Sequence, residues 1–363
     1  MYTPNFSITN NLLTYISRIE AAKAVIDQAA LVPAWEAKFR DEAFTRTVHF
    51  GTKIEGNDLT EEQAQQVVRL DDVSDTTEMI RRTGLMARER DVQEVINYRN
   101  VINWIDSQRH PDIAQIYTTD TLFTIHKLTV LRVIEEKYAG YFRDKQVIVK
   151  SASSGNVVFR PPVAVEIPYL VTDFFSWGTS AVAQNMHAIF RAAITHYQLV
   201  YIHPFLEGNG RTARAMASLV MYALGYDFKK FFSLEQYIDS DVEAYYQALL
   251  SVQQSGESNL TYWLEYFCYG LALELEKVKN QVTKLSKDLK LKRQLGKQVA
   301  LSERQIIMLE LFQQQDEVTS DDMQKVLPNV SVDTILRDVK DLIAKGVIDK
   351  HGVTKGVRYR LLE

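Results

Sequence analysis

Hydrophobic residues recur three and four positions apart through most of this 363-residue chain, and glycine and proline are scarce. This spacing places apolar side chains on one face of an α-helix, so the chain is predicted to be mainly helical. One buried helix is expected over residues 186–201, ending before His203-Pro204. A second is expected from about Arg211 to Leu224, where Gly225 ends it.

The stretch 145–162 breaks the helical pattern. Apolar and polar residues alternate on both sides of the turn sequence Ser153-Ser154-Gly155-Asn156, and Pro161-Pro162 closes the stretch. Alternation with a period of two is typical of β-strands, and a glycine-containing turn between two such runs is typical of a hairpin. We therefore expect one β-hairpin on a helical body.

The pattern changes again after residue 276. Residues 277–297 hold eight Lys or Arg against a single acid, Asp288, on a helical pattern, which indicates a basic connecting helix. Three further helices are expected after it, followed by a small hairpin that includes an alternating tail, and this element order is typical of a winged helix. The expected helices cover residues 302–313, 319–327 and 331–345, and the tail covers 351–361.

Composition adds limits rather than a function. With 46% hydrophobic residues the chain can build sizeable cores, and its length allows two or three domains. Neither a signal peptide nor a run of about 18 apolar residues for a membrane span is found. The single cysteine, Cys268, cannot form an internal disulfide, which fits a reducing cytoplasm. The net charge of −4 argues neither for nor against a nucleic-acid partner.

The richest chemistry lies in residues 203–214, His-Pro-Phe-Leu-Glu-Gly-Asn-Gly-Arg-Thr-Ala-Arg. Pro204 stops a helix from running through His203, so this imidazole is expected at a loop mouth, where it can act as a general base. The glycines on either side of Asn209 let the backbone approach an anion at the start of the next helix. The other candidates, His126, His187 and His196, are interpreted as packed or surface groups.

The charges of this stretch indicate a phosphate site. Arg211 and Arg214 lie in the first helical turn, where a cation is disfavoured by roughly 0.3–1 kcal/mol, so a nearby anion is expected to offset that cost. Glu207 would repel such an anion unless a hard cation lay between them, and it is therefore assigned to Mg²⁺. The alternative, two solvated surface arginines, is disfavoured by the Gly-Asn-Gly turn before them.

The whole stretch resembles the signature of the Fic family, His-x-Phe-x-[Asp/Glu]-Gly-Asn-Gly-Arg-x-x-Arg, at every fixed position. The resemblance implies an adenylyltransferase that moves AMP from ATP to a Tyr, Thr or Ser hydroxyl of a target protein or of itself, with Mg²⁺ as cofactor. It implies that His203 deprotonates the hydroxyl and that Glu207 holds Mg²⁺. The remaining signature residues would bind phosphates: Gly208, Asn209 and Gly210 by their loop, and Arg211 and Arg214 by their guanidiniums.

The resemblance extends beyond the signature. Gly140-Tyr-Phe-Arg143, which precedes the expected hairpin, resembles the segment leading into the flap of Fic proteins, whose edge pairs with the main chain of the target. Residues 147–160 would form this flap. Nucleotide contacts are implied for Val149, Lys150, Ser151 and Ala152 on its first strand and for Tyr245, Tyr246 and Gln253 near the adenosine. The alternative for the tyrosine pair is simple helix packing.

Residues 51–57 resemble the inhibitory motif of Fic proteins, [Ser/Thr]-x-x-x-Glu-[Gly/Asn]. By this resemblance Glu55 would pair with Arg214 and keep the γ-phosphate from binding properly, because a carboxylate competes with a phosphate for a guanidinium. The match is imperfect, since Gly51 occupies the Ser/Thr position and Thr52 comes one place late. Without the resemblance, Glu55 is only a carboxylate before a helix stop.

The C-terminal part raises a rival function. Residues 331–348 resemble the recognition helix of winged-helix regulators, so the chain could be a DNA-binding regulator with the Fic body as a sensor. Residues 301–363 carry nine Lys or Arg and eleven Asp or Glu, and Asp333, Asp338 and Asp341 would face phosphates badly, so protein contact or homodimerisation is favoured over DNA. Removal of AMP, or transfer of another phosphate-containing group, is the alternative within the enzyme class.

We therefore predict a mainly α-helical protein with a helical bundle of the Fic type, a β-hairpin flap and a C-terminal winged helix. The predicted domains are an N-terminal helical region with the inhibitory motif (1–100), a Fic catalytic core (101–275), a basic connector (276–299) and the winged-helix domain (300–363).

Overall fold

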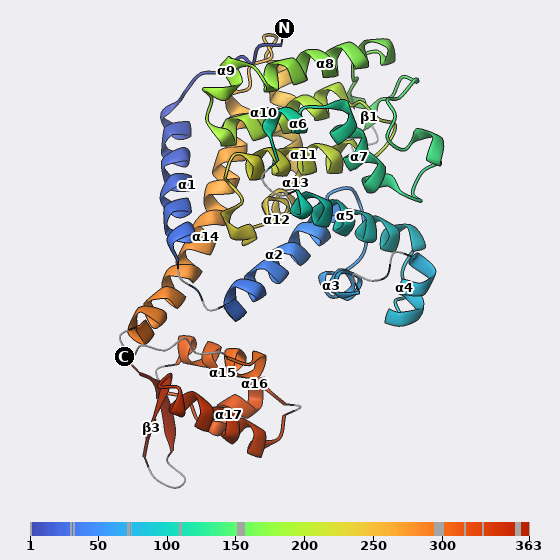
Figure 1. Cartoon of the computed structure of the whole chain (residues 1–363). Coiled ribbons are helices and arrows are strands. Elements are labelled where there is room, and N and C mark those ends of the chain that lie inside the picture. The colour runs from blue at the N-terminus through green and yellow to red at the C-terminus, as the bar shows by residue number, and fades with distance from the viewer. Residues whose placement is uncertain are drawn as a thin grey trace. The chain divides into compact units, whose positions relative to one another are not determined.

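The computed structural model describes residues 2–362 except 30, 32, 71–72, 74, 109–110, 151–156, 294–300, 316, 329 and 353–356. These residues form two compact units, the first built from Met1–Lys23 and Glu42–Lys277 and the second from Ala24–Asp41 and Val278–Glu363. Helices dominate both units (Figure 1), which confirms the predicted mainly α-helical fold class. None of the helices in the described part of the chain has the length and apolar character that a membrane crossing needs.

Seven α-helices precede the hairpin in the described part of the chain. Two of them cross the boundary between the units: α1 begins in the first unit and ends in the second, and α2 begins in the second and ends in the first. The seven are α1 (Asn10–Gln28), α2 (Pro33–Lys53), α3 (Glu61–Arg69), α4 (Thr76–Thr83), α5 (Glu89–Ser107), α6 (Ile113–Ile116) and α7 (Thr119–Val130). After the flap come α8 (Ile167–Gly178), α9 (Ala181–Gln184), α10 (Ala188–Ile202), α11 (Asn209–Ala223), α12 (Leu234–Ser240), α13 (Val242–Gln254) and α14 (Thr261–Arg293), with short 3-10 helices at Glu136–Tyr138, Ala164–Glu166 and Phe228–Lys230.

The first unit is organised around α10 and α11, which pack against each other in its middle (Figure 1). Small side chains allow this close approach, since Ala192 and Ala193 of α10 and Ala213 and Ala217 of α11 are buried. Helices α5 and α7 also pack against α11. The two central helices therefore hold the loop between them, residues 203–208, against a closely packed core.

The predicted hairpin is present. Strand β1 (Val149–Lys150) pairs antiparallel with β2 (Val157–Phe159), with Val149 opposite Phe159. The ring of Phe159 lies 5.8 Å from that of Tyr201, which attaches the hairpin to the end of α10. The turn, and with it Ser151 and Ala152, lies outside the described residues.

The second unit contains the expected three helices and hairpin: α15 (Glu303–Gln314), α16 (Ser320–Val326), α17 (Val332–Ala344), β3 (Ile348–His351) and β4 (Arg358–Leu361). Each helix starts at a Ser or Thr whose hydroxyl accepts a backbone N–H of the first turn: Ser302, Thr319 and Ser331. Residues 276–293 of the predicted basic connector helix, 276–299, are the C-terminal part of α14, and residues 294–299 lie outside the described residues.

Candidate active site

The loop after α10 fixes the position and the protonation of His203. Its backbone is left-handed, with φ of 50°, and its N–H donates to the Leu199 carbonyl at 3.0 Å, so the helix ends here. The ring Nδ1 lies 3.2 Å from the carbonyl of Val200. Since a carbonyl only accepts hydrogen bonds, Nδ1 carries the proton and Nε2 is left as the acceptor.

Burial keeps this imidazole neutral. Burial is the main cause that brings the pKa of His203 down to about 4; the contact with the Val200 carbonyl raises it, the charge of Arg143 lowers it and the charge of Glu55 raises it, each by less than burial lowers it. A neutral ring with a free Nε2 can accept a proton at physiological pH. His203 thus has the state that a general base requires.

Arg143 joins the His203 loop to the flap. Its Nε donates to the His203 carbonyl at 2.8 Å, and its backbone N–H donates to the Pro204 carbonyl at 2.9 Å. The same guanidinium donates to the carbonyls of Lys145 and Pro162, which lie before and after the hairpin. The sequence marks Arg143 only as part of the segment before the hairpin, whereas in the structure this buried residue links the His203 loop to both ends of the hairpin.

His126 shapes the same loop from α7. It is buried, as expected, and its ring stacks on that of Phe205 at a centroid distance of 3.6 Å. Its Nε2 lies 3.0 Å from the Glu207 carbonyl, and its Nδ1 accepts the N–H of Gly140 at 2.9 Å. The sequence predicts only that His126 is a packed or surface group. It cannot predict these contacts with the loop, because a single histidine within a helical pattern does not indicate its partners.

The glycine turn is closed by its asparagine. Asn209 exchanges two hydrogen bonds with the backbone of Phe205, both at 2.9 Å, so its side-chain amide stabilises the loop. Gly208 has φ of 77°, and a Cβ there would lie 2.7 Å from Val130. Helix α11 consequently begins at Asn209, two residues before the expected start.

The structure brings Glu55 and Arg214 together. Nη2 of Arg214 donates to Oε1 of Glu55 at 2.9 Å and to the carbonyl of Gly51 at 2.9 Å. The Glu55 carboxylate lies directly over Gly210, where a Cβ would come within 2.2 Å of Oε1. Burial would raise the pKa of Glu55, but the charges of Arg214 and Arg211 outweigh it and lower the pKa. An anion thus already occupies the space above the glycine turn.

Tyr98 explains why glycine stands at position 51. A Cβ on Gly51 would lie 2.2 Å from Cε1 of Tyr98, whose ring fills the space that a Ser or Thr side chain would need. Arg214 binds the Gly51 carbonyl instead of a hydroxyl. The hydroxyl of Thr52 points elsewhere and donates to the carbonyls of Val48 and His49 in α2.

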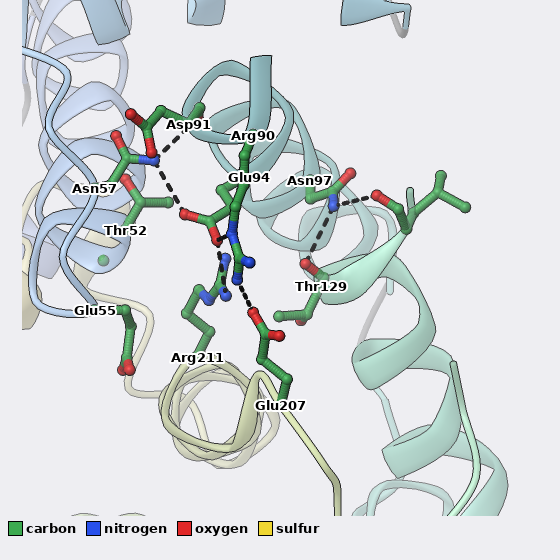
Figure 2. A network of polar contacts seen from close by, with 12 residues as sticks. Thr52, Glu55, Asn57, Arg90, Asp91, Glu94, Asn97, Thr129, Glu207 and Arg211 are labelled. Carbon is green, nitrogen blue, oxygen red and sulfur yellow. Dashed lines mark hydrogen bonds and ion pairs between the residues drawn. The ribbon is translucent and has the colours of Figure 1, made fainter. Parts of the chain in front are cut away.

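Arg211 belongs to a second group of charges (Figure 2). Its Nη2 lies 3.5 Å from Oε1 of Glu94, a buried carboxylate on α5 that also contacts Arg90. Arg90 in turn pairs with Glu207. Arg90 and Glu94 could not be predicted from the sequence as parts of the site. They lie in a helical stretch more than 100 residues before the signature, where charged residues are usually solvated surface groups.

Two observations bear on ligands. Among the described residues, Nε and Nη1 of both Arg211 and Arg214 are buried without a hydrogen-bond partner, which is uncommon for charged donors and favours a bound anion. No cluster of three Asp, Glu, His or Cys suited to a metal occurs in the described part of the chain. One exposed carboxylate with waters and phosphate oxygens is the usual Mg²⁺ arrangement, and Glu207 fits it.

Five of the seven residues outside the signature that were predicted to contact the nucleotide lie within the described part of the chain. Tyr245, Tyr246 and Gln253 all lie on α13. Tyr245 is buried and its hydroxyl lies 2.9 Å from Nε2 of His196, as the packing alternative requires, whereas Tyr246 is 38% exposed. Val149 and Lys150 form β1.

Comparisons with known proteins agree on one family. Residues 116–221 match the model of the Fic/DOC family. Two curated relatives named protein adenylyltransferase Fic are 29% identical over 185 residues, from Nematostella vectensis, and 25% identical over 211 residues, from Drosophila willistoni. These matches cover 51% and 58% of this chain but only 39% and 38% of the relatives, so the chain matches well under half of their length.

Solved structures share the fold. A Fic family protein from Desulfovibrio desulfuricans G20 superposes with a TM-score of 0.65 at 21% identity, covering 99% of this chain and 98% of that chain. A Fic domain containing signaling protein from Bacteroides thetaiotaomicron gives a TM-score of 0.57 at 21% identity, covering 77% and 97%. The first of these likenesses extends over both compact units.

We predict that Gly51→Ala destabilises the protein by about 1–3 kcal/mol, because the added methyl group overlaps the Tyr98 ring. Chemical denaturation measures the change. In a double-mutant cycle with Tyr98→Ala, which removes the ring, the two losses should be clearly less than additive. Additive losses would show that the two positions do not meet.

Proposed function

We propose that this chain, whose residues 116–221 match the model of the Fic/DOC family, is a protein adenylyltransferase that moves AMP from ATP to a Tyr, Thr or Ser hydroxyl. The observation that carries this proposal is the pair of buried arginines with unpaired N–H groups, Arg211 and Arg214, beside a neutral His203. Together they supply positive charge for a polyphosphate and a base for the attacking group, which are the parts that phosphoryl-type transfer needs.

In the proposed reaction Nε2 of His203 accepts the proton of the target hydroxyl. The hydroxyl oxygen forms a bond to the α-phosphorus of ATP, the bond from that phosphorus to the bridging oxygen of the β-phosphate breaks, and pyrophosphate leaves. Arg211, Arg214 and the backbone N–H groups at the start of α11 bind the phosphate oxygens. Mg²⁺ bound at Glu207 would supply further neutralisation of the α- and β-phosphates.

We also propose that Glu55 restrains this activity. Its carboxylate lies over Gly210 and binds Arg214, so it takes the position and the partner that a terminal phosphate needs. A charge-assisted contact of this kind competes directly with an Arg–phosphate contact. ATP would therefore bind productively only when Glu55 moves away.

The target is proposed to pair with the edge of the flap, residues 147–160, by β-augmentation, and the chain itself is one candidate target. Such pairing uses main-chain groups, so it places a hydroxyl near His203 without demanding a particular sequence around it.

DNA binding by the second unit is the second candidate function. Asp338 is buried and pairs with Arg304, and Asp341 accepts a hydrogen bond from Gln305, so two of the three acids on α17 are held by partners within the unit. Arg337 and Lys340 remain exposed on the same helix. This removes part of the electrostatic objection to a nucleic-acid partner.

We expect Glu55→Gly to increase protein labelling from α-labelled ATP in the presence of Mg²⁺, and His203→Ala in that background to abolish it, since the base is lost. Label counting and mass spectrometry for an added AMP group measure the outcome. γ-Labelled ATP serves as the control and should give no label. Label from γ-labelled ATP alone would refute AMP transfer, and unchanged labelling by Glu55→Gly would refute the restraint.

The low pKa of His203, about 4, predicts an unusual pH profile. Only the neutral ring accepts a proton, so kcat/KM of the Glu55→Gly variant should hold level from pH 7 to about pH 5.5 and fall as pH approaches 4. Initial rates at saturating Mg²⁺ across this range measure it. A fall centred near 6.5, the value of an ordinary histidine, would contradict the buried setting.

For the second unit, DNA binding predicts a shift of random duplex DNA that weakens steeply with salt, and Arg337→Ala with Lys340→Ala should reduce it. Electrophoretic mobility at increasing salt measures the effect. No shift at low salt would leave protein contact or homodimerisation as its function.

A further inference from the structure

A chain of charges connects the residues around Glu55 to the signature (Figure 2). At its centre is Glu94 of α5, which is only 5% exposed. One carboxylate oxygen accepts the Asn57 amide at 3.1 Å, and the other lies 3.2 Å from Nε of Arg90 and 3.5 Å from Nη2 of Arg211. Two guanidiniums thus share a single buried carboxylate, which leaves positive charge for another anion.

Arg90 contacts two carboxylates that differ in exposure, 7% for the side chain of Glu94 and 34% for that of Glu207. Its Nε binds buried Glu94, one helical turn away, and its Nη2 binds Glu207. The Arg90 side chain itself is 56% exposed. Ion pairs between exposed groups contribute little and exchange readily, whereas contacts to a buried carboxylate persist because leaving it unpaired is costly. The Glu207 contact is therefore the one that Arg90 can give up.

The proposed function indicates what would replace Glu207 as a partner of Arg90. A cation bound at Glu207 would compete with Arg90 for the same carboxylate, and it would arrive together with phosphate oxygens. Arg90, still anchored on Glu94 beside Arg211, would then have a phosphate as its nearest unpaired anion. Without a cation, Arg90 neutralises Glu207 and prevents a bare carboxylate from repelling the nucleotide.

We propose that Arg90 is a further phosphate-binding residue, contributed by α5 from outside the signature, which exchanges Glu207 for a nucleotide phosphate when a divalent cation binds. Glu94 is its positioning residue and sets Arg90 and Arg211 side by side. The proposal rests on the proposed function, since it requires a nucleotide polyphosphate at this site.

The test measures ATP binding by calorimetry on the 363-residue chain, with Glu55→Gly as the parent so that Glu55 does not occupy the site. Adding Arg90→Ala should weaken ATP binding about tenfold in Mg²⁺, as expected for the loss of one charge-assisted contact. In EDTA the loss should be larger, because Glu207 then faces the phosphates uncompensated. Adding Glu207→Ala to Arg90→Ala should restore much of the EDTA affinity.

Arg88→Ala is the matched control. Arg88 directly precedes α5, its side chain is 62% exposed, and it pairs with Asp58 and Asp91 instead of Glu94 or Glu207. Arg90→Lys, which keeps the charge, should recover part of the affinity, and thermal melting confirms that each variant is folded. Equal ATP affinity of the Arg90→Ala and Arg88→Ala variants in both conditions would overturn the proposal for Arg90 alone. Absence of ATP binding by the parent would overturn the proposed function as well.

Discussion

The contact on which the site depends is the ion pair between the buried guanidinium of Arg214 and the partly exposed carboxylate of Glu55. A guanidinium that is 2% exposed has lost its water, so it needs anionic or carbonyl partners in every state of the protein. The Gly51 carbonyl is one such partner, and the charge of Glu235 lies close enough to add to it. The third partner of Arg214 is an anion that lies above Gly210, and in this structure it is the Glu55 carboxylate. The site therefore stabilises a negatively charged group beside Arg214. What the site can do depends on whether that group is the Glu55 carboxylate or another anion.

Around this pair, the loop of residues 203–210 is held by hydrogen bonds and ring contacts within the protein. Asn209 closes the loop on itself, His126 supports it through Phe205 and Glu207, and Arg143 ties it to both ends of the flap. Because these supports are buried and hydrogen-bonded, His203 keeps one tautomer and one position. Preorganisation of this kind lowers the cost of bringing a base and a phosphate into reactive geometry.

The parts that sequence could predict are those carried by neighbouring residues. The signature is contiguous, the hairpin follows from local alternation, and the helix starts of the second unit follow from Ser302 and Thr319. What sequence could not predict depends on contacts between distant segments. Tyr98 lies 47 positions beyond Gly51 yet fills the space beside it, and Arg90 meets Glu207 from another helix. Periodicity also could not distinguish a separate connector from the continuation of α14, since both share one helical pattern.

The carbonyl of Gly51 determines which part of the Arg214 contacts can vary with sequence. Every residue type carries a main-chain oxygen, so the anchor that it gives Arg214 survives any side-chain change at this position that the Tyr98 ring tolerates. Only the side chain at position 55 then remains as an adjustable partner. Shortening it, or removing its charge, would weaken the grip on Arg214 by degrees while the guanidinium stays in place. The restraint that we propose for Glu55 would therefore be graded rather than all-or-none, and single substitutions at position 55 would change it stepwise.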